Sequence, residues 1–393
     1  MKYAIKSRKI LTPAGFFDGY LLVEDGKIKD LTKEVEAGLK VEDYRSQRII
    51  PGIIDIHNHG ALGWSMTDPC TVADVAGYAK ALPSIGVTSV LPTAKEEAFA
   101  AIADYMENPE LGTKIPGIHS EGPFWVRGGE NSVNENYPKP DVAETKRLLD
   151  LAKGKLIYMA IAPDAPGAHE VIRFLNKNGV LVAACHTRCT AEDVFEAVRK
   201  TKIDSVTHLG NGMDGIHHRH VGSLGGFLLC DNLYYEIITD LHHICADMLK
   251  LYFRIQPYDK FMLISDSNYM SGMPSGKYSR YDRIMNMTED GLIKDQNGRI
   301  CGSGKYVLSN IKMLVEKVDV PLEKAVQMAS INPARFLSID DKTGSIERGK
   351  ACDVIVIDEN YDCVATYIDG QLAYDCKHPK DVINAKAMSR KLD

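Results

Sequence analysis

The sequence has no long apolar run and no excess of positive charge. No stretch of about 18 apolar residues occurs, so we expect no membrane span. The first residues, MKYAIKSRKILTPAG, lack an apolar core followed by a small-residue cleavage site, so we expect no signal peptide. The 47 Lys and Arg residues are outnumbered by 53 Asp and Glu residues, which argues against nucleic acid as a partner.

The nine cysteines are scattered along the chain. Their number is odd and none forms a C-x-x-C pair, so we expect neither a disulfide framework nor a zinc ribbon. This usage indicates a reduced chain in the cytoplasm. With 393 residues, of which 45% are apolar and 25% charged, the chain has the composition of a folded protein with a large core.

Both ends of the chain show the pattern of short β-strands joined by tight turns. Asp25-Gly26 and Asp369-Gly370 each separate two apolar runs, which predicts two hairpins. A β-branched run, DVIVID at residues 353–358, precedes the second of them. We therefore expect residues 1–50 and 341–393 to form one small β-sandwich domain beside a larger domain at residues 51–340.

The middle of the chain alternates apolar, strand-like runs with helical segments. Thr71 and Thr190 each precede an acid by three residues, which is typical of a capped helix start. Strands are expected at residues 49–56, 88–92, 115–119, 156–161, 180–184, 205–208, 234–239 and 261–265. Eight strand and helix pairs favour a (β/α)8 TIM-like barrel. A doubly wound sheet is the alternative, although no G-x-G-x-x-G motif follows an early strand.

Five of the eight expected strands end in a His, Glu or Asp. A barrel carries its catalytic groups at the carboxyl ends of its strands, so these side chains are expected at one face. They are His57, His59, Glu121, His186, His208 and Asp266. All are ligand types for zinc or iron(II). A single His at a strand end is more often structural, but their joint placement predicts a metal centre.

The motifs around these residues carry a resemblance to a known family. They read PGIIDIHNHG (51–60), GIHSEGPF (117–124), CHT (185–187), THLGNGM (207–213), ISDS (264–267) and SINPAR (330–335). The chain resembles the N-acetylglucosamine-6-phosphate deacetylase family of the amidohydrolase superfamily. The resemblance implies a barrel with a small β-domain, and one or two divalent metal ions per chain, zinc or iron(II). His57 and His59 would serve one metal position, His186 and His208 the other, and Glu121 both.

The resemblance also implies an activity and its residues. Asp266, beside the metal ligands and counted among them, would be the general acid and base that cleaves the acetamide of N-acetyl-D-glucosamine 6-phosphate, giving acetate and glucosamine 6-phosphate. The residues implied around this amino-sugar phosphate are His119, Asn211, Gly212, Arg219 and His243. Arg219 matches the position that binds phosphate in the family. The family pattern further implies a homodimer, with pocket residues that can come from the second chain.

Other functions stay open at this point. The family usually follows its Arg with Glu-Pro-Gly, whereas this chain has His220-Val221-Gly222. Such departures touch the sugar pocket, so the substrate could instead be N-acetylgalactosamine 6-phosphate or an unphosphorylated N-acetyl hexosamine. A cyclic-amide hydrolase would need a bridging Lys, which no strand end supplies. A barrel that only binds would be expected to lack some ligands or Asp266.

Overall fold

A ring of parallel strands forms the centre of the computed structural model, which describes residues 2–129, 136–280, 283–379 and 381–392. The strands are β6 (Ile53–Asn58), β9 (Val87–Pro92), β10 (Ile118–Glu121), β11 (Leu156–Ile161), β12 (Leu181–Ala184), β13 (Ser205–Val206), β14 (Tyr234–Ile237) and β15 (Phe261–Leu263). β10 to β15 pair in chain order, and β6 pairs with β9. Single parallel bridges join Thr93 to His119 and Asn58 to Ser267, which closes the ring. The predicted barrel is confirmed.

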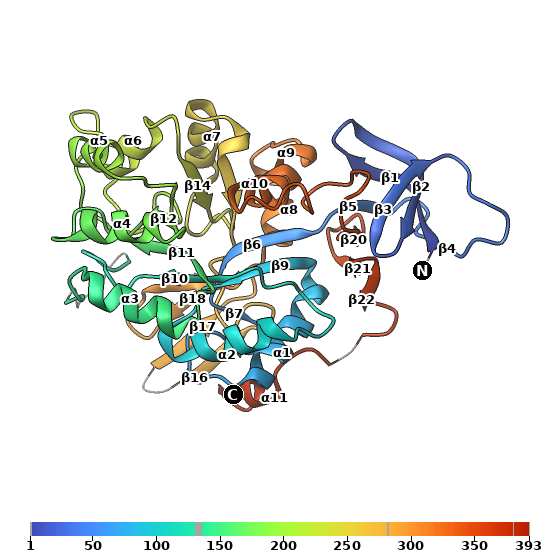
Figure 1. The fold of residues 1–393 in the computed structure, drawn as a ribbon, viewed down its shortest axis with the longest axis horizontal. Helices are drawn as coiled ribbons and strands as arrows, with labels where there is room; N and C mark the ends of the chain where they lie inside the picture. Colours follow the sequence, from blue (N-terminus) through green and yellow to red (C-terminus); the bar gives the residue numbers. More distant parts are fainter. Residues whose placement is uncertain (1, 130–135, 281–282, 380, 393) are drawn as a thin grey trace.

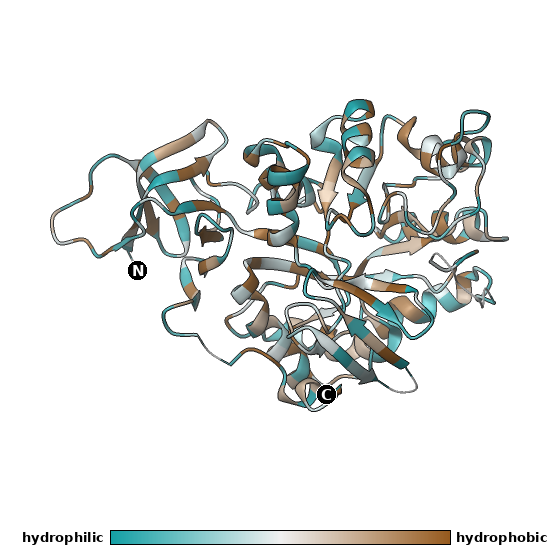
Figure 2. Cartoon of the chain, turned by 180° about the vertical axis from the view of Figure 1, so that it is seen from behind, coloured by the Kyte–Doolittle hydropathy of each residue, from teal (hydrophilic) through white to brown (hydrophobic). Residues whose placement is uncertain are grey.

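Helices pack around the outside of this ring (Figure 1). They are α1 (Val72–Ala81), α2 (Glu96–Glu107), α3 (Val142–Leu151), α4 (Ala168–Lys177), α5 (Ala191–Lys200), α6 (Gly222–Leu228), α7 (Ala246–Ile255), α8 (Val307–Lys317), α9 (Leu322–Ala329) and α10 (Ile331–Phe336). Thr71 and Thr190 form capping boxes with Asp74 and Asp193, as predicted. Apolar residues, brown in Figure 2, occur on strands and helices alike, and β6 and β9 are buried at every position, as expected for strands covered on both faces.

Residues 2–51 and 354–375, from near the two ends of the chain, meet in a second, β-rich part, seen at the right of Figure 1. Its strands are β1 (Lys2–Thr12), β2 (Gly15–Glu24), β3 (Lys27–Thr32), β4 (Val41–Asp43), β5 (Arg48–Pro51), β20 (Val354–Ile357), β21 (Cys363–Ile368) and β22 (Gln371–Asp375). They hydrogen-bond in the order β22-β21-β20-β5-β1-β2-β3, with β4 on β1. Both predicted hairpins form, with Asp25-Gly26 and Asp369-Gly370 at positive φ. The strands belong to one continuous sheet that curls around its own core, rather than to two separate sheets.

Strand β20 joins the two parts of the molecule because its side chains alternate in direction. Val354 and Val356 are buried in the core of the β-rich part. Ile355 and Ile357 belong to the core that packs around the barrel. An ion pair adds to this junction, since the Lys114 ammonium lies 2.9 Å from the Asp353 carboxylate and 2.6 Å from that of Asp369. These contacts fix the start of β6, the first barrel strand, relative to the β-rich part.

Two boundaries differ from the expected ones. The predicted strand at 49–56 is two strands, because β5 pairs with β20 in the β-rich part while β6 enters the barrel. Gly52 separates them, where a Cβ atom would lie 2.2 Å from the Thr88 hydroxyl oxygen. The last residues also leave the β-rich part: α11 (Ala385–Met388) and β23 (Lys391–Leu392) return to the barrel, and β23 pairs with β16 (Gly276–Arg280).

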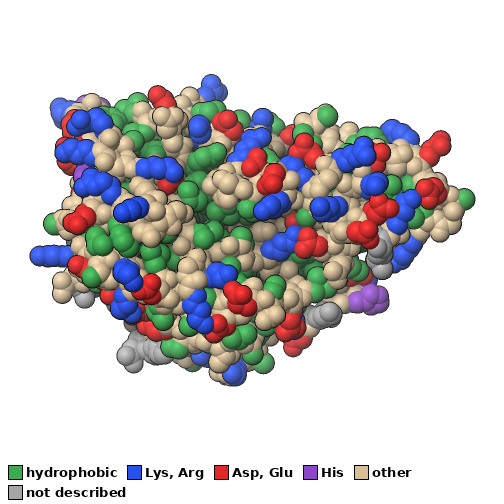
Figure 3. Space-filling view, viewed as in Figure 1, with side chains coloured by type: hydrophobic (Ala, Val, Ile, Leu, Met, Phe, Trp, Pro, Cys, Tyr) green, Lys and Arg blue, Asp and Glu red, His purple; other side chains and the backbone are tan. Residues whose placement is uncertain are grey.

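A small antiparallel sheet follows the last barrel strand and borders the open end of the ring. It contains β16, β17 (Arg283–Met287), β18 (Leu292–Asp295), β19 (Ile300–Ser303) and β23. Two short strands, β7 (Gly60–Ala61) and β8 (Trp64–Ser65), form a hairpin after β6. On the face seen in Figure 3, basic and acidic side chains are interspersed. The net charge of the whole chain is -6. No helix in the described ranges has both the length and the apolar composition of a membrane-crossing segment.

Candidate metal centre

The carboxyl ends of five barrel strands bring the six predicted ligands together. His57 lies in β6 and His59 directly after it, while Glu121 is the last residue of β10. The other three follow β12, β13 and β15. Their ligand atoms form two groups, His57 with His59 and Asp266, and Glu121 with His186 and His208. The face predicted from strand ends alone is therefore the face that the barrel forms.

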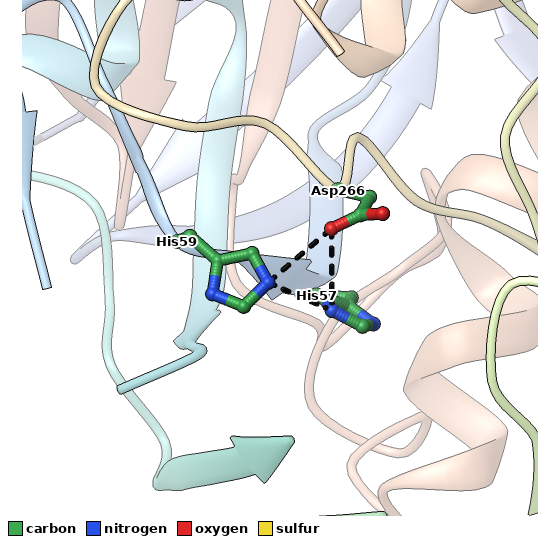
Figure 4. Close-up of side chains that lie close together, drawn as sticks. All are labelled: His57, His59 and Asp266. Atoms are coloured by element: carbon green, nitrogen blue, oxygen red, sulfur yellow. Dashed lines mark hydrogen bonds and ion pairs between the residues drawn. The ribbon is translucent and has the colours of Figure 1, made fainter. Parts of the chain in front are cut away.

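In the first group, three side chains converge on one point (Figure 4). The Nε2 atoms of His57 and His59 are 3.2 Å apart. Oδ1 of Asp266 lies 3.5 Å from Nε2 of His57 and 3.3 Å from Nε2 of His59. His57 and His59 meet because residues two apart on a strand point the same way.

In the second group, Oε1 of Glu121 faces two rings. It lies 2.9 Å from Nε2 of His186 and 2.8 Å from Nε2 of His208, and the two nitrogens are 3.2 Å apart. The other oxygen of Glu121, Oε2, lies 3.2 Å from Nε2 of His59 and 3.8 Å from Nε2 of His57. Glu121 thus has one oxygen in each group and bridges them.

These distances fit divalent metal ions. Two donors about 2.1 Å from an ion at tetrahedral angles are about 3.4 Å from each other. The first group has separations of 3.2, 3.3 and 3.5 Å, and the second is slightly tighter. Imidazole nitrogens that face each other at 3.2 Å need a shared proton or a cation between them. The side chains can therefore hold one ion in each group, with Glu121 common to both.

Three of these residues have a backbone conformation that non-glycine residues rarely adopt. The φ angles of His186, His208 and Asp266 are 43°, 29° and 46°. Such left-handed conformations cost of order 1–3 kcal/mol each and persist where the surrounding structure imposes them. Here they turn the chain sharply at the end of a strand and aim each side chain at the centre of the ring.

The charges of the site shift the pKa values of its members. Burial opposes protonation of His57, but the negative charges of Asp266 and Glu236 outweigh it and raise the pKa of His57 well above its usual value. Burial likewise opposes ionisation of Glu121, but hydrogen bonds from His186 and His208 hold the pKa of Glu121 well below its usual value. Burial acts the same way on Asp266, where the charge of His57 lowers the pKa. The carboxylates are thus kept ionised.

A cavity of about 1070 Å³ opens above the two groups. This exceeds the range of about 300–1,000 Å³ that is usual for ligand pockets. Asn211, Gly212 and His243 line it, as the sequence predicted, and so does Trp125, whose ring lies 4.5 Å from that of His186. Gly212 has to be small, because a Cβ atom there would lie 2.7 Å from Nδ1 of His186.

Two predicted substrate residues lie elsewhere. His119 is fully buried behind His57, with its Nδ1 2.9 Å from the Thr93 hydroxyl, and is not among the residues lining the cavity. Burial and the nearby charge of His57 lower the pKa of His119 well below its usual value, so the ring is neutral. Because it is buried and does not line the cavity, His119 is not positioned for the expected contact with substrate. Arg219 is exposed on a small turn closed by a bridge between His217 and His220, and it also does not line this cavity.

Sequence reasoning missed the residues that surround the ligands. Glu236 and Tyr158 lie within strands β14 and β11 and belong to no motif, so only the closed barrel reveals them. The cationic lining also had no sequence signal, because its members come from distant segments. They are Lys95, Arg127, Arg280, Arg283 and Lys294. Arg127 is paired with Asp214 and Arg280 with Asp68.

Known proteins are similar to this chain in sequence and in fold. The model of the amidohydrolase family matches residues 48–373. An N-acetylgalactosamine-6-phosphate deacetylase of Escherichia coli O157:H7 is 29% identical over 95% of this chain and 100% of its own length. An N-acetylglucosamine-6-phosphate deacetylase of Vibrio furnissii is 28% identical over 85% and 88%. The solved N-acetylglucosamine-6-phosphate deacetylase of Pasteurella multocida matches in fold with a TM-score of 0.85, at 24% identity over 95% of this chain and 99% of its own.

Glu121 should affect both metal positions, because each of its oxygens faces a different group. We expect Glu121→Ala to retain less than one ion per chain after dialysis, whereas His186→Ala should lose only the ion of the second group. Elemental analysis of dialysed protein, with exposed His378→Ala as the control, measures this. Equal metal content in Glu121→Ala and His186→Ala would contradict a bridging role.

Proposed function

The chain belongs to the amidohydrolase family, and we propose that it hydrolyses the acetamide of N-acetyl-D-glucosamine 6-phosphate to acetate and glucosamine 6-phosphate. The observation that carries this proposal is the pair of ligand groups bridged by Glu121, with Asp266 facing the cavity. Several relatives of similar length are named for this reaction. We also propose that it acts in the cytoplasm, because its nine cysteines are odd in number and form no C-x-x-C pair.

We propose that the two groups hold two divalent ions, zinc or iron(II). Histidine nitrogen and carboxylate oxygen suit both metals. When bound, such an ion lowers the pKa of a coordinated water to about 7 and polarises a carbonyl oxygen. The first group offers four donor atoms when Oε2 of Glu121 is included, and the second offers three. The second group therefore leaves more room for water and substrate.

Asp266 is the group that moves the proton. Its carboxylate is ionised, and it lies at the floor of the cavity beside His57 and His59. It accepts a proton from the attacking water and then donates it to the amide nitrogen as the bond to carbon breaks. One residue can serve both steps because, once water has added, the attacking oxygen and the leaving nitrogen are bonded to the same carbon and lie within reach of one carboxylate.

We propose that His243 holds the substrate. Its Nδ1 lies 2.8 Å from Oδ2 of Asp240, and the hydroxyl of Ser303 donates to the same oxygen. Burial opposes protonation of His243, but the hydrogen bond to Asp240 dominates and raises its pKa. A protonated ring can donate from its other nitrogen to a sugar or phosphate oxygen. His243 is therefore a binding residue fixed by Asp240.

The 4-epimer is a second candidate substrate. A relative named for N-acetylgalactosamine 6-phosphate matches 95% of this chain at 29% identity, similar to the identity of the relatives named for the glucosamine compound. The sequence around Arg219 also departs from the pattern of the glucosamine family. Both epimers carry the same acetamide and phosphate, so the metal centre does not distinguish them.

Acetate release from a panel of N-acetyl hexosamines tests the proposal. We expect release from N-acetyl-D-glucosamine 6-phosphate or its galactosamine epimer, with the higher kcat/KM identifying the substrate, and at least tenfold lower kcat/KM without the phosphate. Metal-depleted enzyme is the control. Its activity should be lost and should return when zinc or iron(II) is added. No release from any member by metal-loaded protein would contradict the proposal.

Removal of the proton-transfer group should separate catalysis from binding. We expect Asp266→Asn to lower kcat by about 10²–10⁴-fold, the usual contribution of general acid and base catalysis. Initial rates and metal content measured on the same preparation distinguish this from metal loss. A variant with normal kcat and a full metal complement would exclude Asp266 from proton transfer.

Phosphate recognition involves cations from two sources. The chain's own cavity offers Lys95, Arg283 and Lys294, for which no ion pair occurs in the described ranges. Arg219 does not line this cavity in its own chain, and the family pattern implies that pocket residues can come from the second chain of a homodimer. We propose that Arg219 acts in this way.

Arg219→Ala should therefore weaken the binding of phosphorylated substrate alone. A charge-assisted hydrogen bond is worth about 1.5–3 kcal/mol, so we expect KM for the phosphorylated sugar to rise at least tenfold. The KM of the unphosphorylated analogue should not change. Size-exclusion chromatography with light scattering must also show a dimer. A monomeric enzyme, or equal effects on both substrates, would refute the role of Arg219.

A further inference from the structure

Glu236 is a carboxylate that lies directly behind the metal centre. It belongs to β14 and is 0% exposed. Burying an ionised carboxylate costs several kcal/mol unless hydrogen bonds and opposite charges satisfy it. Its partners must therefore explain why the chain has an acid at the centre of its barrel.

Both oxygens of Glu236 are used. Oε2 lies 2.9 Å from Nδ1 of His57, whose ring is also fully buried. Oε1 accepts a hydrogen bond from the Tyr158 hydroxyl at 2.5 Å, and that hydroxyl is 2.7 Å from the Ser205 hydroxyl. The backbone N–H of His208 also points at Oε2, at 3.4 Å. Three barrel strands thus hold the carboxylate in one orientation.

This arrangement fixes which nitrogen of His57 faces the ligand group. A carboxylate is an acceptor, so Nδ1 of His57 carries a proton and donates it to Glu236. Nε2 is then the nitrogen left to bind a cation, and it is the one that faces His59 and Asp266 at 3.2 and 3.5 Å. In the second group, Nδ1 of His186 and of His208 has no hydrogen-bond partner in the described ranges. Within the described residues, the hydrogen bond from Nδ1 of His57 to Glu236 therefore distinguishes the first ligand group from the second.

We infer that Glu236 is a positioning residue that holds His57 in its metal-binding orientation, so that it selectively stabilises the ion held by His57, His59 and Asp266. Outer carboxylates of this kind fix the ring tautomer and make the imidazole a stronger ligand. Tyr158 in turn fixes the carboxylate. This inference rests on the proposed metal-dependent function, because it concerns one of the two positions proposed there.

Chelator competition tests the inference without reference to turnover. Wild-type protein, Glu236→Leu and Glu236→Gln are loaded with zinc, titrated with chelator, and analysed for ions retained per chain. We expect Glu236→Leu to release one ion at a chelator concentration about 10–100-fold lower than the wild type, with the second ion unchanged. Glu236→Gln should fall between them, because its side-chain oxygen can still accept from Nδ1 of His57.

Two controls separate positioning from general loss of structure. Asp353→Asn alters another buried acid, held by Lys114 and Thr343 at the junction with the β-rich part, and should leave the metal titration unchanged. Unfolding temperatures identify variants that fail to fold. If Glu236→Leu does not fold, the chelator titration of Glu236→Gln, which keeps the shape of the side chain, tests the inference. Tyr158→Phe should shift the same ion as Glu236→Leu, by less.

The outcomes are distinct. Release of both ions at the wild-type chelator concentration, or an equal shift of both, would overturn the inference and leave the proposed function intact. A wild-type chain that retains no ion while still folded would overturn both. Selective loss of one ion, with partial retention in Glu236→Gln, supports the positioning role.

Discussion

The molecule is organised around the neutralisation of one carboxylate, Glu121, whose side chain is only 9% exposed. Its ion partners within the described ranges are four histidines, two on each oxygen. A carboxylate without a Lys or Arg can remain buried and ionised only if protons or metal ions supply positive charge between it and the rings. Because its oxygens face different groups, two positive centres satisfy it better than one. The bridging position of Glu121 thus links the barrel geometry to the chemistry.

The barrel achieves this geometry with strained backbone at the site, and packing in the rest of the fold offsets the strain energy. The proposed ligands come from strand ends far apart in the sequence, and three of them adopt a left-handed backbone conformation. Such conformations persist because the parallel strands and their packed helices leave the loops no alternative. The β-rich part contributes by fixing the origin of β6 through β20 and through the pairing of Lys114 with Asp353. Although the chain is acidic overall, cations line the cavity beside the centre.

Sequence reasoning brought the proposed ligands to one face because their positions follow from periodicity. His57 and His59 are two residues apart on a strand, and the strands before Glu121, His186, His208 and Asp266 are apolar runs that can be recognised without a structure. It missed Glu236 and Tyr158, since a residue inside a strand looks the same whether it faces the barrel or its helices. The family resemblance also implied that His119 contacts the substrate, whereas the barrel buries this side chain away from the cavity. The joined strand at 49–56 was misread for a similar reason, as both β5 and β6 are apolar and only Gly52 separates them.

The most direct test is the anomalous X-ray scattering of crystals of the zinc-loaded or iron-loaded protein. The account predicts two anomalous peaks per chain, one among His57, His59 and Asp266 and one beside His186 and His208, with Glu121 contacting both through different oxygens. Peaks located instead at the exposed His217 to His220 turn, or a fully loaded crystal with no peak next to Glu121, would contradict it.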